Sequence, residues 1–420
     1  MSAVTSHVQL RRLDGSLTAE TLLGALATRE RPVLAAFAGH VIVAADPVEV
    51  VTGAEVWDAF GIRCEPRSRG PAAAAGGWIG LLSYDLGGTI ERLPAPHEDP
   101  GGPPLADVGR YDTVAIFDPY GGCTLATVDA ESALDELAEA AAGARALAPS
   151  APPDATVATS LDADSYRAAV GRARELIQAC DCYQVNLAQR LAAPWTASPL
   201  ALASGLWDAA GPSSHRAYVG LAEGAVVSAS PERLVRVVDG VADSEPIKGT
   251  APVGEWERLS ASAKDRAEHV MIVDLVRNDL GRVARPGGVS VPRLFGYLST
   301  PYVEHMVSGV RAELRDDVTA ADVLRAVFPG GSVTGTPKVR AMEVIRELEP
   351  VARGPAFGSV VTVGTDGAIE ASITIRTAWV AGGEARYWCG GAVVWDSDPE
   401  SERREAWAKA TPFLRAVGAR

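Results

Sequence analysis

The sequence predicts one large α/β or α+β body. Strand-like stretches, which alternate or run apolar, are interleaved with amphipathic stretches of helical period along the 420 residues. No short unit recurs at a fixed spacing, which disfavours a solenoid. A hydrophobic content of 47% with 22% charged residues is ordinary for a globular protein, so the chain can bury a sizeable core.

The first 150 residues combine short strands with turns and end in a helical pattern. Residues 32–37, 41–43 and 113–117 are predicted strands, and residues 131–147, rich in Ala and Glu, are a predicted helix. The segment 148–154 contains three prolines and has no periodicity. We therefore expect a boundary there, between an N-terminal region of residues 1–150 and a catalytic region of residues 155–420.

Helices and strands continue to alternate after this boundary. Residues 165–180 are predicted to form an amphipathic helix, and residues 217–238 alternate like paired strands that break at Gly220 and Gly224. A further helix begins near Ser262 and ends at Gly281, and another spans residues 339–348.

Charge and signature motifs exclude several classes of function. A net charge of -14 without a basic run disfavours nucleic-acid and anionic-membrane surfaces, which require clustered Lys and Arg. The usual signatures of dinucleotide-binding, P-loop, zinc-protease and serine-hydrolase proteins are missing. The five cysteines are predicted to be buried free thiols. We expect neither a secretory leader nor a transmembrane span, since no apolar stretch follows the charges near the N-terminus and no apolar run of transmembrane length occurs. We expect a cytoplasmic protein.

A glycine-rich segment, residues 328–338, precedes the predicted helix of residues 339–348. Its backbone N–H groups would suit an anion at the start of that helix. A glycine-rich turn that only caps the helix fits the pattern equally well.

Lys248 is the first candidate for chemistry. It lies in E-P-I-K-G-T, between Ile247 and Gly249. An apolar environment would lower the pKa of the amine and make it a nucleophile. An exposed lysine at a strand end is the alternative.

Carboxylates form the second candidate group. Glu268 lies just before an apolar stripe in the helix that begins near Ser262, and Glu402 and Glu405 lie three residues apart on one face of a C-terminal helix. Two helices that present acids to one pocket would suit Mg²⁺. Solvated helix faces are the alternative.

From Gly76 to Lys409 the chain resembles the chorismate-utilising enzymes, which include anthranilate, aminodeoxychorismate, isochorismate and salicylate synthases. The matching segments are C-Y-Q-V-N-L-A-Q-R (182–190), S-A-S-P-E-R-L (228–234), P-I-K-G-T (246–250), A-K-D-R-A-E-H-V-M-I-V-D-L-V-R-N-D-L-G-R (263–282), H-M-V-S-G-V (305–310), F-P-G-G-S-V-T-G-T-P-K-V-R-A-M-E (328–343), S-I-T-I-R-T (372–377) and D-S-D-P-E-S-E (396–402). The resemblance implies a large β-sandwich-like core flanked by helices, with the N-terminal part packed onto it.

Two positions divide this family by reaction. Members that add water resemble one another in carrying a lysine where this chain has Gln184, whereas a glutamine is typical of ammonia users, since ammonia attacks without being deprotonated. Anthranilate synthases read P-I-A-G-T where this chain has P-I-K-G-T. Lys248 therefore indicates the branch that aminates chorismate at C4.

The resemblance implies roles for further residues. Glu232 would be the general acid, Glu268 and Glu405 would bind Mg²⁺ with Glu402 nearby or acting through water, and Gln184 would lie in the catalytic pocket. Residues expected around the substrate are His305 near the ring, Arg376 on the enolpyruvyl carboxylate, Lys409, and the backbone of Gly249, Thr250, Gly390 and Gly391.

The implied chemistry uses Lys248 as a covalent nucleophile that attacks C2 as the C4 hydroxyl departs, after which ammonia attacks C4 and expels the lysine. We expect a separate glutamine amidotransferase subunit to supply the ammonia, because no amidotransferase segment is found in this chain. Open alternatives are amination at C2, a paralogue of specialised metabolism, and a chorismate-binding paralogue without turnover.

Four positions depart from the family pattern near the expected substrate. Ala356 replaces a Tyr or Trp, Thr336 replaces the Ala of G-A-P-K, Ala392 ends the glycine run, and Ala408 replaces an Asn. A wider pocket with a modified substrate would explain Ala356. Compensation by Phe357 would explain it as well.

Overall fold

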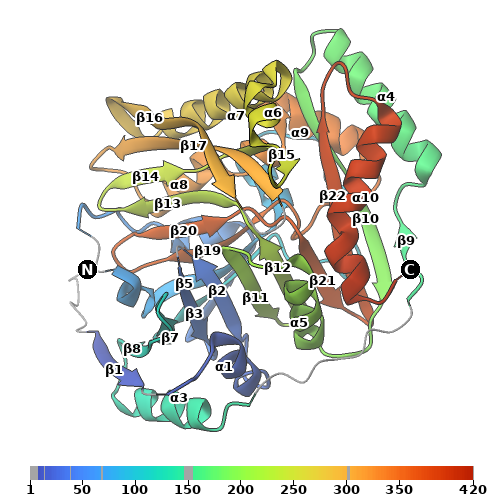
Figure 1. The fold of residues 1–420 in the computed structure, drawn as a ribbon. Coiled ribbons are helices and arrows are strands. Elements are labelled where there is room, and N and C mark those ends of the chain that lie inside the picture. Colours follow the sequence, from blue (N-terminus) through green and yellow to red (C-terminus); the bar gives the residue numbers. More distant parts are fainter. Residues whose placement is uncertain are drawn as a thin grey trace.

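The computed structural model describes residues 8–13, 15–37, 39–67, 70–145, 155–299 and 303–419. Two large sheets form its body, and helices cover their outer faces (Figure 1). Every strand pairing in the described ranges is antiparallel, so the fold is of the predicted α+β kind and contains no doubly wound parallel sheet.

The first sheet has 12 strands. In spatial order they are β1 (Gln9–Leu13), β8 (Cys123–Thr127), β7 (Thr113–Phe117), β3 (His40–Ala44), β2 (Val33–Phe37), β11 (His215–Leu221), β12 (Gly224–Ser230), β21 (Thr377–Ala381), β22 (Glu384–Val393), β10 (Gln184–Pro194) and β18 (Gly335–Thr336), with β9 (Ala158–Thr159) also paired to β10.

The second sheet has 10 strands. Their order is β15 (Ile247–Pro252), β17 (Val303–Leu314), β14 (Val241–Ser244), β13 (Arg233–Val238), β20 (Ile369–Ser372), β19 (Ser359–Val363), β5 (Gly77–Leu82), β6 (Ala106–Tyr111) and β4 (Glu49–Thr52), with β16 (Ala284–Ser299) paired to β17.

The N-terminal strands are built into both sheets. In the first sheet β2 pairs with β11, and in the second β5 pairs with β19. The expected packing of the N-terminal part onto the rest is therefore confirmed. The predicted boundary at residues 148–154 lies outside the described residues, and the division into two regions stays a prediction.

The helices are α1 (Ala19–Ala25), α2 (Val56–Ala59), α3 (Ser132–Ala142), α4 (Ala163–Gln178), α5 (Pro199–Ala210), α6 (Trp256–Ala261), α7 (Ala263–Gly281), α8 (Ala320–Val327), α9 (Lys338–Leu348) and α10 (Pro399–Ala416), with short 3₁₀ turns η1 (Gly53–Glu55), η2 (Gly70–Ala74), η3 (Tyr84–Thr89) and η4 (Gly331–Val333). Helices α4, α5, α9 and α10 pack on the first sheet and α7 on the second (Figure 1). None of the described helices is long and apolar enough to cross a bilayer.

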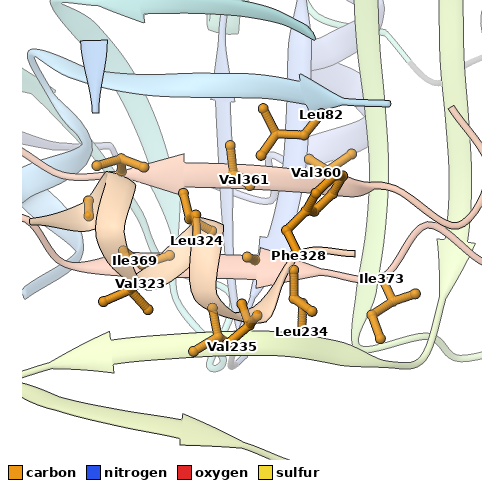
Figure 2. Close-up of a cluster of buried hydrophobic side chains, with 14 of the residues drawn as sticks. Leu82, Leu234, Val235, Val323, Leu324, Phe328, Val360, Val361, Ile369 and Ile373 are labelled. Carbon is orange, nitrogen blue, oxygen red and sulfur yellow. The ribbon is translucent and has the colours of Figure 1, made fainter. Parts of the chain in front are cut away.

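Helix α8 is one of the elements that fill the core. Val323 and Leu324 of α8 and the following Phe328 pack among the apolar side chains of β13, β19 and β20 (Figure 2). All three are at most 2% exposed, so the glycine-rich segment that starts at Phe328 begins from a rigid position.

The predicted strand break at Gly220 is wrong. Strand β11 continues through Gly220 to Leu221, and the chain turns between Leu221 and Gly224. A Cβ at position 220 would lie 2.7 Å from Pro32 Cδ, so the glycine permits close approach of two strands and does not make a turn. The helix expected over residues 131–147 is also shorter, since α3 covers Ser132–Ala142. The five cysteines are free, as expected, but the prediction that they are buried is wrong for Cys180, which is exposed, and Cys64 is only partly buried.

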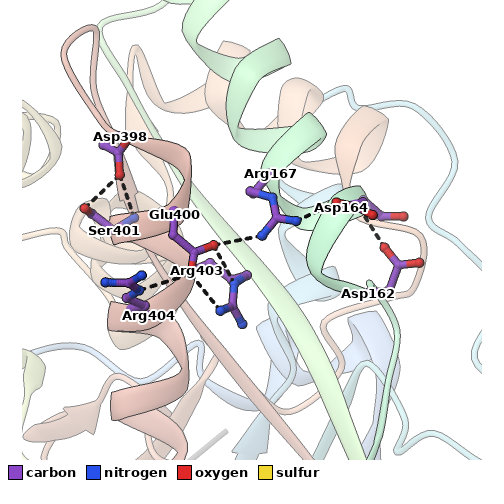
Figure 3. A network of polar contacts seen from close by, with 9 residues as sticks. Asp162, Asp164, Arg167, Asp398, Glu400, Ser401, Arg403 and Arg404 are labelled. Atoms are coloured by element: carbon purple, nitrogen blue, oxygen red, sulfur yellow. Dashed lines mark hydrogen bonds and ion pairs between the residues drawn. The ribbon is translucent and has the colours of Figure 1, made fainter.

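A polar network fixes α10 against α4 (Figure 3). Glu400 accepts hydrogen bonds from Arg403 and Arg404 of its own helix and, at 2.8 Å, from Arg167 of α4. Asp398 caps α10 by accepting from the backbone N–H of Ser401 at 2.9 Å. The start of α10, which carries Glu402 and Glu405, is therefore held at both its cap and its flank.

Candidate active site

Strand β22 and helix α10 bring three charged side chains over Gly391. A Cβ at this position would lie 3.3 Å from Glu402 Oε2, 3.7 Å from Lys409 Nζ and 3.8 Å from Glu405 Oε1. Lys409 Nζ lies 2.8 Å from Glu405 Oε1 and donates to the Gly390 carbonyl at 3.1 Å. The absence of a side chain at position 391 thus leaves a space that charged groups line.

Lys248 approaches the same space from β15. Its Nζ lies 3.7 Å from Glu268 Oε2 on α7, and its side chain is 20% exposed. Burial lowers the pKa of Lys248, and the Glu268 carboxylate opposes that shift. The charges of Lys409, Glu405 and Glu402 also act on this pKa, which places the acids of α7 and α10 around one amine.

The local backbone explains the position of Lys248. The pairing of β15 with β17 shifts register between Lys248, opposite Met306, and Thr250, opposite His305. Gly249 lies at this bulge with a φ of 82°, a conformation that favours glycine. Ser262 caps α7 and so fixes Glu268 beside the bulge.

Glu232 lies between β12 and β13 and is 6% exposed. Burial raises its pKa to about 7, against the opposing effects of Ser332, Lys248, Lys409 and Arg376. The backbone of Glu232 is fixed by its N–H to Ser230 Oγ at 3.1 Å and by its carbonyl, which accepts from the Ile373 N–H at 3.0 Å. A carboxyl group with this pKa is half protonated near neutral pH and suits a general acid.

His305 and Arg376 complete the set around Lys248 and Glu232. Burial lowers the pKa of His305, the Arg376 charge lowers it further, and a hydrogen bond with the Gly249 backbone opposes the shift. Arg376 has a φ of 52° in the connection between β20 and β21. Gly390 packs so closely on β10 that a Cβ would lie 2.1 Å from the Leu187 carbonyl oxygen, so only glycine fits there.

Gln184 is placed at the end of β10, directly opposite Thr336 of β18. It is fully buried, and neither its amide oxygen nor its amide nitrogen has a hydrogen-bond partner. Among the contacts that the structure describes, none joins Gln184 to Lys248 or Glu232. Thr250 is placed only by its backbone pairing with His305.

The three carboxylates expected to hold metal do not form a ready ligand set. Within the described ranges, no group of three or more His, Cys, Asp or Glu side chains is close enough to hold a metal ion. The Nζ atoms of Lys248 and Lys409 instead face Glu268 and Glu405. The donors are still of the kind that Mg²⁺ takes, because Glu402 Oε2 and Glu405 Oε1 both border the space over Gly391. Burial and the neighbouring Glu405 charge raise the pKa of Glu402, and a cation bound there would relieve that repulsion.

Two side chains at this site were given no role from the sequence. Ser332 of η4 lies beside Glu232 and lines a cavity with it. His269 contacts Ser308 Oγ at 2.6 Å, and burial lowers its pKa to about 4. The glycine-rich segment was the available signal for Ser332. In the same glycine-rich segment, Lys338 Nζ donates a hydrogen bond to Asp279 Oδ2 of α7 at 2.6 Å.

Residues 27–415 match the model of the chorismate binding enzyme family. The chain is 39% identical to aminodeoxychorismate synthase component 1 of Klebsiella aerogenes over 356 residues, covering 81% of this chain and 77% of the relative. It is 38% identical to anthranilate synthase component 1 of Thermus thermophilus over 358 residues, with coverage of 81% and 77%.

The fold also matches a solved structure of anthranilate synthase component I from Streptococcus pneumoniae. The TM-score is 0.76 over 99% of this chain and 93% of the other, at 24% identity. This likeness concerns the fold. Glu232, Lys248, Glu268 and the acids of α10 all lie inside the matched range of residues 27–415.

Proposed function

Because the chain belongs to the chorismate binding enzyme family, we propose that it aminates chorismate at C4 and forms 4-amino-4-deoxychorismate, the precursor of p-aminobenzoate. The observation that carries the proposal is that Lys248, whose side chain is 20% exposed, lies close enough to the buried acid Glu232 for its charge to act on the pKa of that acid. Burial lowers the pKa of Lys248 and raises that of Glu232, so both groups are driven toward their neutral forms in one site.

These neutral forms are the ones that the reaction requires. The Lys248 amine attacks C2, the two ring double bonds shift, and the C4–O bond breaks. Glu232 gives its proton to the departing hydroxyl, which leaves as water. The product of this step is a covalent adduct of chorismate less water on Lys248, with Glu232 as the carboxylate.

Ammonia completes the exchange. Its lone pair attacks C4, the double bonds shift back, and the C2–N bond breaks to release Lys248 as the neutral amine. The ammonium formed at C4 returns one proton to Glu232, so that acid and nucleophile are both restored. The net reaction consumes chorismate and ammonia and yields the amine and water.

The remaining residues orient the substrate. Glu268, Glu402 and Glu405 would hold Mg²⁺, which when bound supplies charge neutralisation for the ring carboxylate. Arg376 and Lys409 offer positive charge for carboxylates. The open space over Gly391 allows close approach, and the backbone of Gly249, Thr250 and Gly390 is proposed to contact the substrate as well. His305 is proposed to lie near the reacting ring. We also propose a cytoplasmic location, and a separate glutamine amidotransferase subunit as the source of ammonia, in keeping with the name component 1 of the relatives.

Amination at C2 is the competing function, and relatives named anthranilate synthase component 1 are almost equally similar. Lys248 favours C4, because an amine nucleophile that occupies C2 leaves C4 to ammonia. The test is incubation with chorismate, Mg²⁺ and an ammonium salt, followed by identification of the product by mass spectrometry and NMR. A C4 amine supports the proposal. Anthranilate or a C2 amine would replace it with the competing function.

A further inference from the structure

Lys248 lies in a strand whose pairing fixes its backbone only in part. Strand β15 is at one edge of the second sheet, and among the described strands it pairs with β17 alone. The register shifts between Lys248 and Thr250, so the ladder is interrupted directly after the lysine. Because a reacting group that moves by about 1 Å can lose about a hundredfold in rate, any further contact that fixes this backbone matters for the reaction.

A buried histidine joins α7 to β17 beside this bulge. His269 follows Glu268 directly and is fully buried, and its Nε2 lies 2.6 Å from Ser308 Oγ of β17. Ser308 is fully buried as well, and its N–H donates to the carbonyl of Pro246, two residues before Lys248, at 3.2 Å. The two side chains therefore connect the helix that carries Glu268 with the strand that carries Lys248.

The hydrogen bonds of Ser308 indicate which ring nitrogen of His269 carries the hydrogen. Ser308 Oγ accepts the Phe295 N–H at 3.0 Å. Among the described contacts, His269 Nε2 is the only acceptor for the hydroxyl hydrogen, so Ser308 donates to Nε2 and the ring hydrogen is on Nδ1. The Phe295 ring, with its centroid 5.7 Å from that of the imidazole, packs beside it.

The backbone of Lys248 is the group that Nδ1–H can reach. Burial lowers the pKa of His269, and a hydrogen bond with the Lys248 backbone opposes the shift. Ser308 already occupies Nε2, which leaves Nδ1 as the donor for that contact. The contact is loose, since Nδ1 has no partner of standard hydrogen-bond geometry.

We propose that His269, oriented by Ser308, is a positioning residue that holds the Lys248 backbone through its Nδ1–H and so directs the lysine amine at the substrate. The inference rests on the proposed function. His269 exchanges no proton with chorismate in this role. It acts on the rate of attack by Lys248 and not on the binding of chorismate, because it fixes the nucleophile and touches no part of the substrate.

Two amide side chains separate the roles of the two ring nitrogens. An asparagine amide reaches the position of Nδ1, and a glutamine amide reaches that of Nε2. His269→Asn keeps a donor toward Lys248 and should form the chorismate adduct within about threefold of the parent rate. His269→Gln keeps only the contact with Ser308 and should slow adduct formation about tenfold, the effect of about one lost hydrogen bond.

Rapid-quench mass spectrometry with chorismate and Mg²⁺ but without ammonia measures the rate of adduct formation. Calorimetry with chorismate should give the parent Kd for both variants, since only the attack is affected. Ser308→Ala leaves the donor of His269 in place but removes its orientation, so it should slow adduct formation about threefold.

Trp57→Phe is the matched control. Trp57 of α2 is 4% exposed, and its ring N–H donates to Thr89 Oγ1 at 3.0 Å, in the N-terminal part of the chain. Its loss removes one hydrogen bond between a buried ring nitrogen and a hydroxyl, as His269→Asn does. It should leave the rate of adduct formation unchanged, and urea denaturation of all variants reports their stability.

The outcomes separate this inference from the proposed function. Adduct formation at the parent rate in His269→Gln would show that the positioning role is wrong. Equal losses in His269→Asn and His269→Gln would also overturn it, because the histidine would then only fill its place in the fold. If His269→Gln does not fold, a parental rate in Ser308→Ala overturns the role instead. A parent protein that forms no adduct refutes the proposed function, and this inference with it, before any variant is compared.

Discussion

The pKa values of Lys248 and Glu232 are moved in opposite directions by the same cause. Burial disfavours the charged form of each, so it lowers the pKa of the amine and raises that of the carboxyl to about 7. An exposed pair would form a lysine cation and a carboxylate at neutral pH, and neither would be able to start the reaction. Burial of both groups is thus the physical basis of the proposed mechanism.

Replacement of the nucleophile tests this basis directly. Lys248→Ala should reduce C4 amination on the order of a hundredfold or more, because ammonia would have to reach C4 without a covalent intermediate. Chorismate binding should survive, and traces of a C2 amine are expected at high ammonia. Mass spectrometry of the parent protein with chorismate alone should find an adduct on the peptide that contains Lys248.

Lys264→Ala is the control for this experiment, since Lys264 is 54% exposed and pairs with Asp396. It should keep the adduct and most of the activity. An unmodified peptide in the parent, together with a Lys248→Ala variant of parental rate, would reduce Lys248 to a structural residue.

The pH dependence of adduct formation reports on Glu232. The acid must hold its proton to release water, so the rate should decline as the pH rises above about 7. Protonation of Lys248 should reduce the rate at the acidic end of the profile. Because the pKa of Lys248 is lowered, this loss of rate should occur at a lower pH than for an exposed lysine. Rapid-quench mass spectrometry without ammonia gives the profile free of the titration of ammonia. A rate that continues to rise to pH 9 would exclude Glu232 as the acid.

The acids of α7 and α10 are predicted to set the need for Mg²⁺. Glu268→Ala and Glu405→Ala should each raise the Mg²⁺ concentration for half-maximal activity at least about tenfold, because the substrate carboxylate would lose its cation. Titration of Mg²⁺ at saturating chorismate measures this, and calorimetry with Mg²⁺ alone gives a readout without turnover. Glu347→Ala, on the exterior of α9, serves as control. Parental Mg²⁺ dependence in either variant would end the metal assignment.

At the scale of elements, the start of α10 decides where its acids lie. Asp398 caps the helix, Pro399 occupies its first turn, and Arg167 of α4 holds Glu400 from the side (Figure 3). Glu402 and Glu405 follow within the first two turns, so the fixed start of the helix determines where their carboxylates lie. A helix that frayed at this end would move the acids away from Gly391.

Loss of the cap should therefore affect stability and the site together. Asp398→Ala is expected to lower the free energy of unfolding and to weaken Mg²⁺ binding, whereas Asp398→Asn, which can still cap, should have a smaller effect. Urea denaturation and Mg²⁺ titration measure the two quantities. Glu175→Ala, at an exposed acid on α4 that pairs with Arg172 outside this network, provides the comparison. Equal losses from Asp398→Ala and Asp398→Asn would show that the charge, not the cap, is what matters.

At the scale of the whole molecule, local sequence patterns predicted single helices and strands well, but they did not predict which elements lie next to one another in the fold. The helix from Ser262 to Gly281 was predicted at both ends because cap and terminator are local signals. The strand break at Gly220 was predicted wrongly, because this glycine is needed for close contact with Pro32, nearly 190 residues earlier in the chain. The order of strands in both sheets depends on such distant pairings, which periodicity does not encode.

The site residues also divide into those that the sequence predicted and those that depend on distant contacts. Lys248 and the acids of α7 and α10 were predicted mainly from family resemblance, since composition alone favoured solvated side chains. The structure brings them around one space because β15, α7 and α10 converge there. Ser332 was missed because a serine in a glycine-rich turn gives no sign of which distant carboxyl it will contact.

One buried ion pair joins several of these distant parts. Arg353 is 1% exposed and Glu349 is 4% exposed. Arg353 donates to both oxygens of Glu349, to the Val333 carbonyl of η4 at 2.7 Å and to the Asn186 carbonyl of β10 at 2.6 Å. Its guanidinium also lies over the rings of Tyr84 and Phe357. The pair therefore links the first sheet, the glycine-rich segment and the region around η3.

Removal of one partner should be more damaging than removal of both. Arg353→Met leaves the Glu349 carboxylate buried without its counter-charge and is expected to lower the free energy of unfolding by about 3–5 kcal/mol. In the double variant Arg353→Met with Glu349→Gln, the neutral amide can still accept the Ala188 N–H that Glu349 accepts at 2.8 Å, so part of the loss should be recovered. Urea denaturation of the parent, the two single variants and the double variant gives the coupling energy. If the two single losses simply add in the double variant, the pair is not coupled, and Arg353 stabilises the fold through its carbonyl and ring contacts alone.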